Sequence, residues 1–140
     1  MTYPETKLNP EWIHNPITPE VVKWCESFGK YLAPQDRNDR SALTTSQLRR
    51  FFGEVKRIQM QKKYDMASIA MLNPLLAYAV GRDIKNGRPQ TRIAEFQEEI
   101  SRAVSAIRLE NKKEDYDNFI NIFEAIVAYH KYYGGKDSKN

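Results

Sequence analysis

Positively charged side chains recur at intervals of seven residues in one stretch of this chain. Arg49, Lys56 and Lys63 form one series, and Arg50 and Arg57 form a second. Residues seven apart on an α-helix lie within about 20° of one another around its axis, so each series forms a row. Such rows can neutralise phosphates, and the longer one, about 21 Å at 1.5 Å per residue, could follow several phosphates of a nucleic-acid strand.

The net charge of the chain is concentrated in this stretch. Residues 43–64 hold six basic residues and one acidic residue, which gives +5, whereas the whole chain carries +4. Residues 1–42 sum to −1 and residues 65–140 to zero. Composition leaves two interpretations open: a solvated face whose cations pair with carboxylates of the protein, or a surface that binds nucleic acid.

Two further residues bear on this choice. Gly53 lies between the cationic pairs, where glycine costs about 1 kcal/mol relative to alanine in a helix. The close approach of an outside backbone would explain it, and so would a tight contact between two helices. Arg82 follows an almost continuous apolar stretch. We therefore expect a partly buried guanidinium that needs a carboxylate from another helix or a phosphate.

No catalytic or metal-binding constellation stands out, so we expect no catalytic residue, no metal and no cofactor. The sequence has no phosphate-binding glycine loop, no HExxH pattern and no paired cysteines at zinc spacing. Cys25 and His130 fall on apolar helix faces, which predicts buried structural roles. The acidic run 114–117 opens a helix, where carboxylates complement the helix dipole. A metal-dependent nuclease is therefore the least supported class.

The apolar periodicity predicts an all-α protein, a compact five-helix bundle with an extended N-terminal arm. The helices are expected at residues 19–33, 44–64, 66–84, 89–110 and 114–133. No stretch alternates as a strand does. We divide the chain into a proline-rich arm (1–17), a helical bundle domain (18–135) and a frayed tail (136–140).

Two segments carry more specific expectations. Residues 66–84 are apolar almost all round, which is typical of a central, buried helix. Pro74 should kink or break this helix, and Asn73 could cap its second half. In the arm, Trp12 and Ile13 should attach the chain to the body. The sequence shows no leader peptide and no membrane-spanning apolar run, and its single cysteine favours a cytoplasmic location.

Three motifs resemble those of a known family, the small subunits of the type III-A CRISPR (Csm) effector complex. Residues 43–49 read LTTSQLR, residues 76–82 read LAYAVGR and residues 123–137 read FEAIVAYHKYYGGKD. They occur in the order that the family has, and the resemblance covers roughly residues 43–137. The arm and the first helix match more loosely.

The resemblance implies a non-catalytic RNA-binding subunit within a ribonucleoprotein. Several copies would stack on one another beside the repeated backbone subunits and line the channel that holds the CRISPR guide RNA and the target RNA. In this family RNA cleavage belongs to the backbone subunits, and DNA cleavage and cyclic oligoadenylate synthesis belong to the large polymerase-like subunit. The alternative is a helical scaffold that touches protein partners without contacting RNA.

The resemblance and the charge pattern together give a set of candidate contacts. Gln47 and Arg49 lie in the first motif and Arg82 in the second, whereas the others follow from helix geometry. Guides differ in sequence, so we expect contacts to backbone phosphates rather than to bases. The candidate RNA-binding residues are Gln47, Arg49, Arg50, Lys56, Arg57, Lys63 and Arg82.

Overall fold

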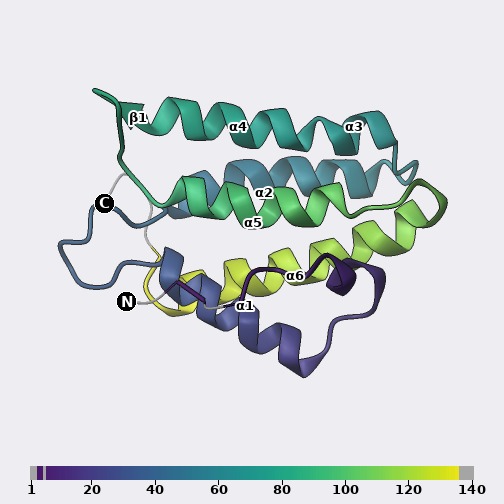
Figure 1. The fold of residues 1–140 in the computed structure, drawn as a ribbon, viewed down its shortest axis with the longest axis horizontal. Coiled ribbons are helices and arrows are strands. Elements are labelled where there is room, and N and C mark those ends of the chain that lie inside the picture. Colours follow the sequence, from purple (N-terminus) through teal and green to yellow (C-terminus); the bar gives the residue numbers. More distant parts are fainter. Residues whose placement is uncertain (1–2, 5, 136–140) are drawn as a thin grey trace.

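The computed structural model describes residues 3–4 and 6–135, which fold into layered helices (Figure 1). The α-helices are α1 (Pro19–Leu32), α2 (Thr45–Met60), α3 (Met66–Ala70), α4 (Leu72–Asp83), α5 (Ile93–Ser105) and α6 (Lys112–Tyr132). Short 3-10 helices are η1 (Pro10–His14) and η2 (Leu109–Asn111), and β1 (Ile84–Lys85) pairs with β2 (Arg88–Pro89). The predicted all-α bundle is confirmed, with strands restricted to that one hairpin within the described residues.

An aromatic cluster joins three of the helices at the centre of the bundle. Phe51 of α2 stacks on Phe123 of α6 with ring centroids 5.5 Å apart, and Phe96 of α5 meets the same ring edge-on at 5.6 Å. Phe119 contacts Phe123 one turn away, at 6.0 Å. These rings are buried, so the apolar face of α2 is committed to the core and its cations are directed elsewhere.

The remaining helices pack around this centre. α1 lies along α6, and α4 packs on α5 and α2 at the opposite side of the molecule (Figure 1). Gly29 of α1 faces α6 so closely that an added Cβ would lie 2.9 Å from the Ile126 carbonyl oxygen. The α1–α6 contact therefore depends on the absence of a side chain there. No helix among the described residues has the length and apolar character needed to cross a membrane.

Residues 66–84 are interrupted, as predicted, but the prediction that they form a central, buried segment is wrong. α3 ends at Ala70, four residues before Pro74, which lies in the first turn of α4 and has no N–H to pair with the Ala70 carbonyl. Asn73 lies inside α4 and does not cap it. Only Leu72 and Leu76 of α4 are buried, because α4 lies at an edge of the bundle.

Two other predicted boundaries also differ. The second helix ends at Met60, because Lys62 and Tyr64 have φ values of 61° and 48°, which cannot continue a right-handed helix. The fourth helix covers Ile93–Ser105 rather than 89–110, and residues 84–89 form the hairpin. The predicted frayed tail, 136–140, lies outside the described residues.

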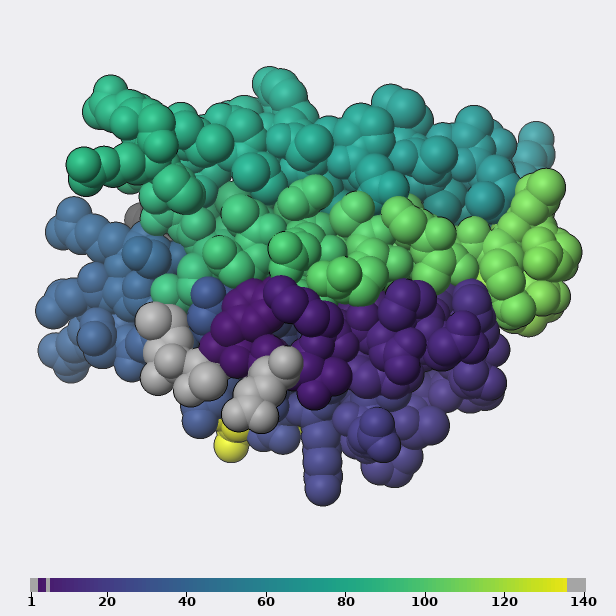
Figure 2. Space-filling model, viewed as in Figure 1, coloured from purple at the N-terminus to yellow at the C-terminus, as the bar shows by residue number. Residues whose placement is uncertain are grey.

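The N-terminal arm is attached to the body by its aromatic and apolar side chains. Ile13 is fully buried, and Trp12 meets Trp24 of α1 edge-on with ring centroids 5.5 Å apart, as predicted. The backbone N–H of Leu8 donates to the buried carboxylate of Glu99 on α5 at 2.8 Å, and the Tyr3 hydroxyl donates to the same group. Figure 2 shows the N-terminal segment, in dark purple, lying against the layer that α5 forms.

Candidate nucleic-acid interface

The first turn of α2 is fixed by a reciprocal cap. Gln47 donates its backbone N–H to Thr44 Oγ1 at 3.1 Å, and its Oε1 accepts the Thr44 N–H at 2.8 Å. Its Nε2 donates to Thr91 Oγ1 at 3.3 Å. This arrangement satisfies two N–H groups that the helix start would otherwise leave unpaired. Gln47, a predicted RNA contact, therefore also positions the cationic helix.

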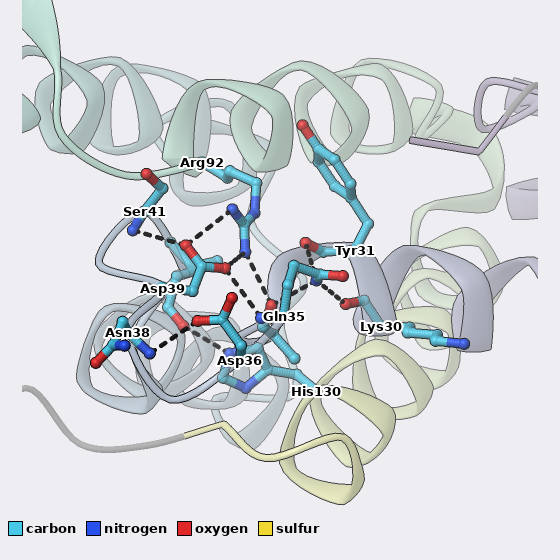
Figure 3. A network of polar contacts seen from close by, with 11 residues as sticks. Lys30, Tyr31, Gln35, Asp36, Asn38, Asp39, Ser41, Arg92 and His130 are labelled. Carbon is cyan, nitrogen blue, oxygen red and sulfur yellow. Dashed lines mark hydrogen bonds and ion pairs between the residues drawn. The ribbon is translucent and has the colours of Figure 1, made fainter. Parts of the chain in front are cut away.

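A buried polar network holds the loop that leads into α2 (Figure 3). Arg92, at the start of α5, donates to Asp39 Oδ2 at 2.7 Å and to the Ala33 carbonyl at 2.8 Å. The hydrogen bond from Arg92 holds the pKa of the Asp39 carboxyl below its usual value. Arg92 thereby joins Ala33, at the start of the loop, and Asp39, in its middle, to the start of α5.

His130 of α6 supports the same loop from the other side. Its Nε2 donates to the Leu43 carbonyl at 2.6 Å, one residue before the Thr44 cap. The ring is fully buried, as predicted, and burial lowers the pKa of His130. The neutral ring with its proton on Nε2 is the form that makes this contact.

The cations of α2 flank its buried face on two different sides. Arg50 and Arg57 border a groove against α3 and α4 that has Leu72 and Leu75 in its wall. Lys56 lies on the α6 side, where its Nζ is 3.9 Å from Glu124 Oε1. The two rows therefore face different neighbouring helices. Each row spans about 10.5 Å within the helix, at 1.5 Å per residue.

Lys63 does not extend either row. The helix ends at Met60, so the geometry that aligned Lys63 with Arg49 and Lys56 does not apply, although Lys63 is exposed. The three-residue row of about 21 Å expected from the sequence is therefore wrong in its length.

Ion pairing distinguishes the cations that remain on the helix. Both Nε and Nη2 of Arg57 donate to Glu54 Oε1, at 2.9 and 2.6 Å. Arg49 and Arg50 are exposed and form no ion pair with any carboxylate of the described residues. These two have no charge partner in the described protein.

Arg82 is exposed, so the prediction of a partly buried guanidinium is wrong. It lies in the last turn of α4, the edge helix, where the apolar stretch before it is itself only partly covered. Its guanidinium carbon is 5.8 Å from the Tyr78 ring centre, and no described carboxylate lies within ion-pairing distance. Of the two partners considered for Arg82, a carboxylate from another helix is not found among the described residues, and a phosphate stays a prediction.

Arg50 and Arg82 come together at one open cleft between α2 and α4, of about 540 Å³. Gln47 also borders the cleft, so three of the predicted residues meet there. Lys85 of the hairpin adds a cation that the sequence analysis missed, although the Asn-Gly pair beside it is a hairpin signal.

The carboxylate in the wall of the cleft is already engaged. Asp83 Oδ2 accepts the backbone N–H groups of Gln90 and Thr91 at 3.1 and 2.9 Å, and Oδ1 accepts the Thr91 hydroxyl at 2.9 Å. Asp83 therefore serves the loop that follows the hairpin. The cleft presents cations with hydrogen-bonding side chains between them, which suits a phosphate group.

Gly53 faces outward between the two rows. It is exposed, and an added Cβ would meet nothing within 4 Å. A tight contact with another helix of the described chain therefore does not explain this glycine. The close approach of an outside backbone stays a prediction.

The cysteine and an aspartate of the acidic run, which were considered for catalysis or metal binding, are buried within the protein. Cys25 is fully buried, and burial raises the pKa of its thiol to about 12. Asp115 of the acidic run accepts from Arg108 Nε at 3.0 Å. Among the described residues, no group of three or more histidine, cysteine, aspartate or glutamate side chains is placed to hold a metal ion.

Comparison with known proteins gives one match. The family model described as Csm2 Type III-A matches residues 18–136, which include α1 through α6. No curated protein and no solved structure matches the chain. The matched range contains the cleft and all seven predicted contact residues.

Proposed function

The chain belongs to the Csm2 family, the small subunits of the type III-A CRISPR (Csm) complex, and on that basis we propose that it binds guide and target RNA through backbone phosphates. In this proposal copies of the chain stack along the complex, beside its other subunits. The chain itself carries out no catalysis.

The observation that supports RNA binding best is the meeting of Arg50 and Arg82 at one cleft. They lie on different helices, 32 positions apart in the sequence, and both border the same opening. Neither forms an ion pair with a described carboxylate, and the one carboxylate in the wall is hydrogen bonded to the following loop. Unpaired cations that converge from separate elements favour an external anion over a solvated face.

The cleft also fits a ligand whose sequence varies. Phosphates are identical at every nucleotide, whereas the base edges of an A-form duplex lie in a deep, narrow major groove that side chains cannot read. Arginine forms paired hydrogen bonds to phosphate oxygens and keeps its charge at all physiological pH values. A subunit that accepts any guide is therefore best served by arginines directed at the backbone.

The second candidate function is a helical scaffold that contacts only protein. Exposed large apolar side chains favour it, among them Tyr78 at 65% exposure and Tyr132 at 76%. Lys56 is near Glu124, and Arg57 is paired with Glu54, so part of the cationic helix is already neutralised. Protein contacts through these side chains could exist together with RNA at the cleft. Only a measurement of RNA binding therefore distinguishes the two candidate functions.

The test compares two double variants of the full chain. Arg50→Gln/Arg82→Gln removes the two arginines of the cleft, and Arg49→Gln/Lys56→Gln removes the two cations on the α6 side of α2. Each double variant replaces two exposed or half-exposed cations, so we expect the two variants to fold with similar stability. We expect the first pair to reduce RNA affinity more, because Lys56 has a carboxylate nearby.

The matched control is Lys23→Gln/Arg37→Gln, which removes one lysine and one arginine that are exposed elsewhere. Binding of all variants to labelled RNA is measured by anisotropy at several salt concentrations, because phosphate contacts make affinity fall with salt. Equal affinity of the cleft variant and this control would favour the scaffold function.

A further inference from the structure

The hairpin that follows α4 carries two cations on one of its faces. β1 and β2 pair antiparallel, with Lys85 opposite Arg88 and Ile84 opposite Pro89. Side chains alternate between faces along a strand, so Lys85 and Arg88 share one face and Ile84 and Pro89 share the other. All four residues are exposed, and the hairpin projects from the end of α4 (Figures 1 and 2).

The turn holds this pair in a defined position. Asn86 and Gly87 have φ values of 53° and 75°, the pattern of a two-residue turn with both central residues in the left-handed region. Such turns match the natural twist of the strands, and Asn-Gly is their preferred sequence. The Cβ atoms of directly opposed residues lie about 4.5–5.5 Å apart, so the two cationic side chains begin next to one another on this face.

The fold gives these charges no evident partner. Like charges directly opposite one another destabilise a strand pair, and neither Lys85 nor Arg88 forms an ion pair with a described carboxylate. The adjacent Asp83 is hydrogen bonded to Gln90 and Thr91. Arg82 lies in the last turn of α4, where a cation also stabilises the helix dipole, but Arg88 lies on the returning strand, beyond that turn.

The charged face is continuous with the cleft. Lys85 lines the same opening as Arg50 and Arg82, and Arg88 is its cross-strand neighbour. We propose that the hairpin is a second phosphate-binding element, whose Lys85 and Arg88 contact the backbone of the RNA strand where it leaves the cleft. This inference rests on the proposed RNA-binding function and assigns two contacts that neither the sequence motifs nor the cationic helix supplies.

The test uses the full chain with Lys85→Gln/Arg88→Gln. Its controls are Lys23→Gln/Arg37→Gln, which makes the same charge change elsewhere, and the swap Lys85→Arg/Arg88→Lys, which keeps both charges. RNA affinity is measured with single-stranded and duplex RNA between 50 and 200 mM salt. We expect the neutral hairpin to flatten the slope of log K against log salt by about 0.7–0.9 for each phosphate that the protein no longer neutralises, and the swap to retain the wild-type slope.

The Arg50→Gln/Arg82→Gln variant separates failure of this inference from failure of the proposed function. If the neutral hairpin matches its charge control while the cleft variant loses affinity, the hairpin inference is overturned and RNA binding at the cleft stands. If both match the control, both proposals fail. If the neutral hairpin keeps RNA affinity but no longer co-purifies with the other complex subunits, the hairpin binds an acidic protein surface, which also overturns the inference.

Discussion

Glu54 is the acidic residue within α2, and its carboxylate accepts two hydrogen bonds from Arg57. The contact neutralises a cation that borders the groove against α3 and α4. The geometry of this pair resembles many surface ion pairs, whose contribution to stability is small because both groups are largely solvated. Its consequence for RNA binding should therefore exceed its consequence for folding.

We predict that Glu54→Gln raises RNA affinity. The substitution removes a negative charge and releases Arg57 to contact phosphate, so affinity should rise about 1.5- to 5-fold, the size of one screened surface interaction. Anisotropy titrations at low salt measure it, with Glu124→Gln, near Lys56 on the other side of α2, as the comparison. A fall in affinity on Glu54→Gln would mean that Glu54 positions Arg57 rather than neutralises it.

His130 gives a pH dependence to folding. Its pKa in the folded protein lies below that of an exposed histidine, so the unfolded chain takes up a proton at a higher pH than the folded chain does. The free energy of unfolding should therefore fall as the pH is lowered through about 6.5, by at most about 1.4 kcal/mol per pH unit from this residue.

Urea unfolding at pH 7, 6 and 5 measures this dependence. In His130→Gln the slope should be smaller, because the amide can still donate to the Leu43 carbonyl but does not titrate. The lowered pKa of Asp39 affects stability only at more acidic pH, so it does not obscure this interval. Identical slopes in wild type and variant would show that another group is responsible.

The sequence predicted the burial of some single residues correctly and of others wrongly. The buried positions of Cys25 and His130 followed from their places on apolar helix faces. The exposure of Arg82 did not follow, because the apolar residues before it suggested a central helix. Burial depends on which helix lies at the edge of the bundle, and periodicity within one segment does not contain that information.

At the scale of elements, two glycines in helices have opposite surroundings. Gly29 of α1 lies against the α6 backbone, whereas Gly53 of α2 faces open space. The same substitution to alanine therefore tests packing at one position and helix propensity at the other.

We predict that Gly29→Ala lowers the free energy of unfolding by about 1–3 kcal/mol. The added Cβ would lie 2.9 Å from the Ile126 carbonyl oxygen and 2.9 Å from the His130 backbone nitrogen. Backbone atoms cannot move aside without displacing a helix. Thermal or urea unfolding measures the change. A variant as stable as wild type would indicate that α1 and α6 can separate slightly at no cost.

We predict that Gly53→Ala has the opposite effect on stability, an increase of about 0.5–1 kcal/mol, because alanine is the better helix former at a site with no steric conflict. If an RNA backbone approaches Gly53, the same variant will bind RNA more weakly despite its higher stability. Unfolding and RNA titration on one sample therefore separate the two roles. Unchanged RNA affinity would leave this glycine without a part in binding.

The sequence identified the helices better than their ends. Leu48, Phe51, Val55 and Ile58 of α2 follow helical periodicity and are buried. The end of α2 depends on positive φ values at Lys62 and Tyr64, for which neither residue type has a special preference. The hairpin was missed because its strands have two residues each, too short for alternation to be visible, and only its Asn-Gly turn could have indicated it.

At the scale of the whole molecule, the three sequence motifs belong to different elements. The first motif contains the cap and first turns of α2, the second lies in α4, and the third begins in the middle of α6 and includes its second half. α2 and α4 supply the two arginines of the cleft, whereas α6 contributes His130, which supports the loop before α2. The fold thus connects the first two motifs directly and the third through a buried hydrogen bond.

We predict that Tyr132→Ala lowers the occupancy of this subunit in the assembled complex while leaving the isolated chain folded. The ring is 76% exposed and meets Tyr133 edge-on, and exposed aromatic side chains are enriched where proteins associate. Purification of the complex followed by subunit quantification measures occupancy, and circular dichroism checks folding. Wild-type occupancy would remove Tyr132 from the stacking surface.

The central claim is that the cations of α2 bind RNA phosphates irrespective of sequence. The most direct measurement compares the wild-type chain with the variant that replaces Arg49, Arg50, Lys56 and Arg57 by alanine, using two RNAs of unrelated sequence across a salt series. We predict that the variant binds both RNAs more weakly to the same extent, with a salt slope flatter by about 0.7–0.9 for each phosphate left without its cation. Wild-type affinity and slope in the folded variant, or a weakening confined to one of the two sequences, would contradict it.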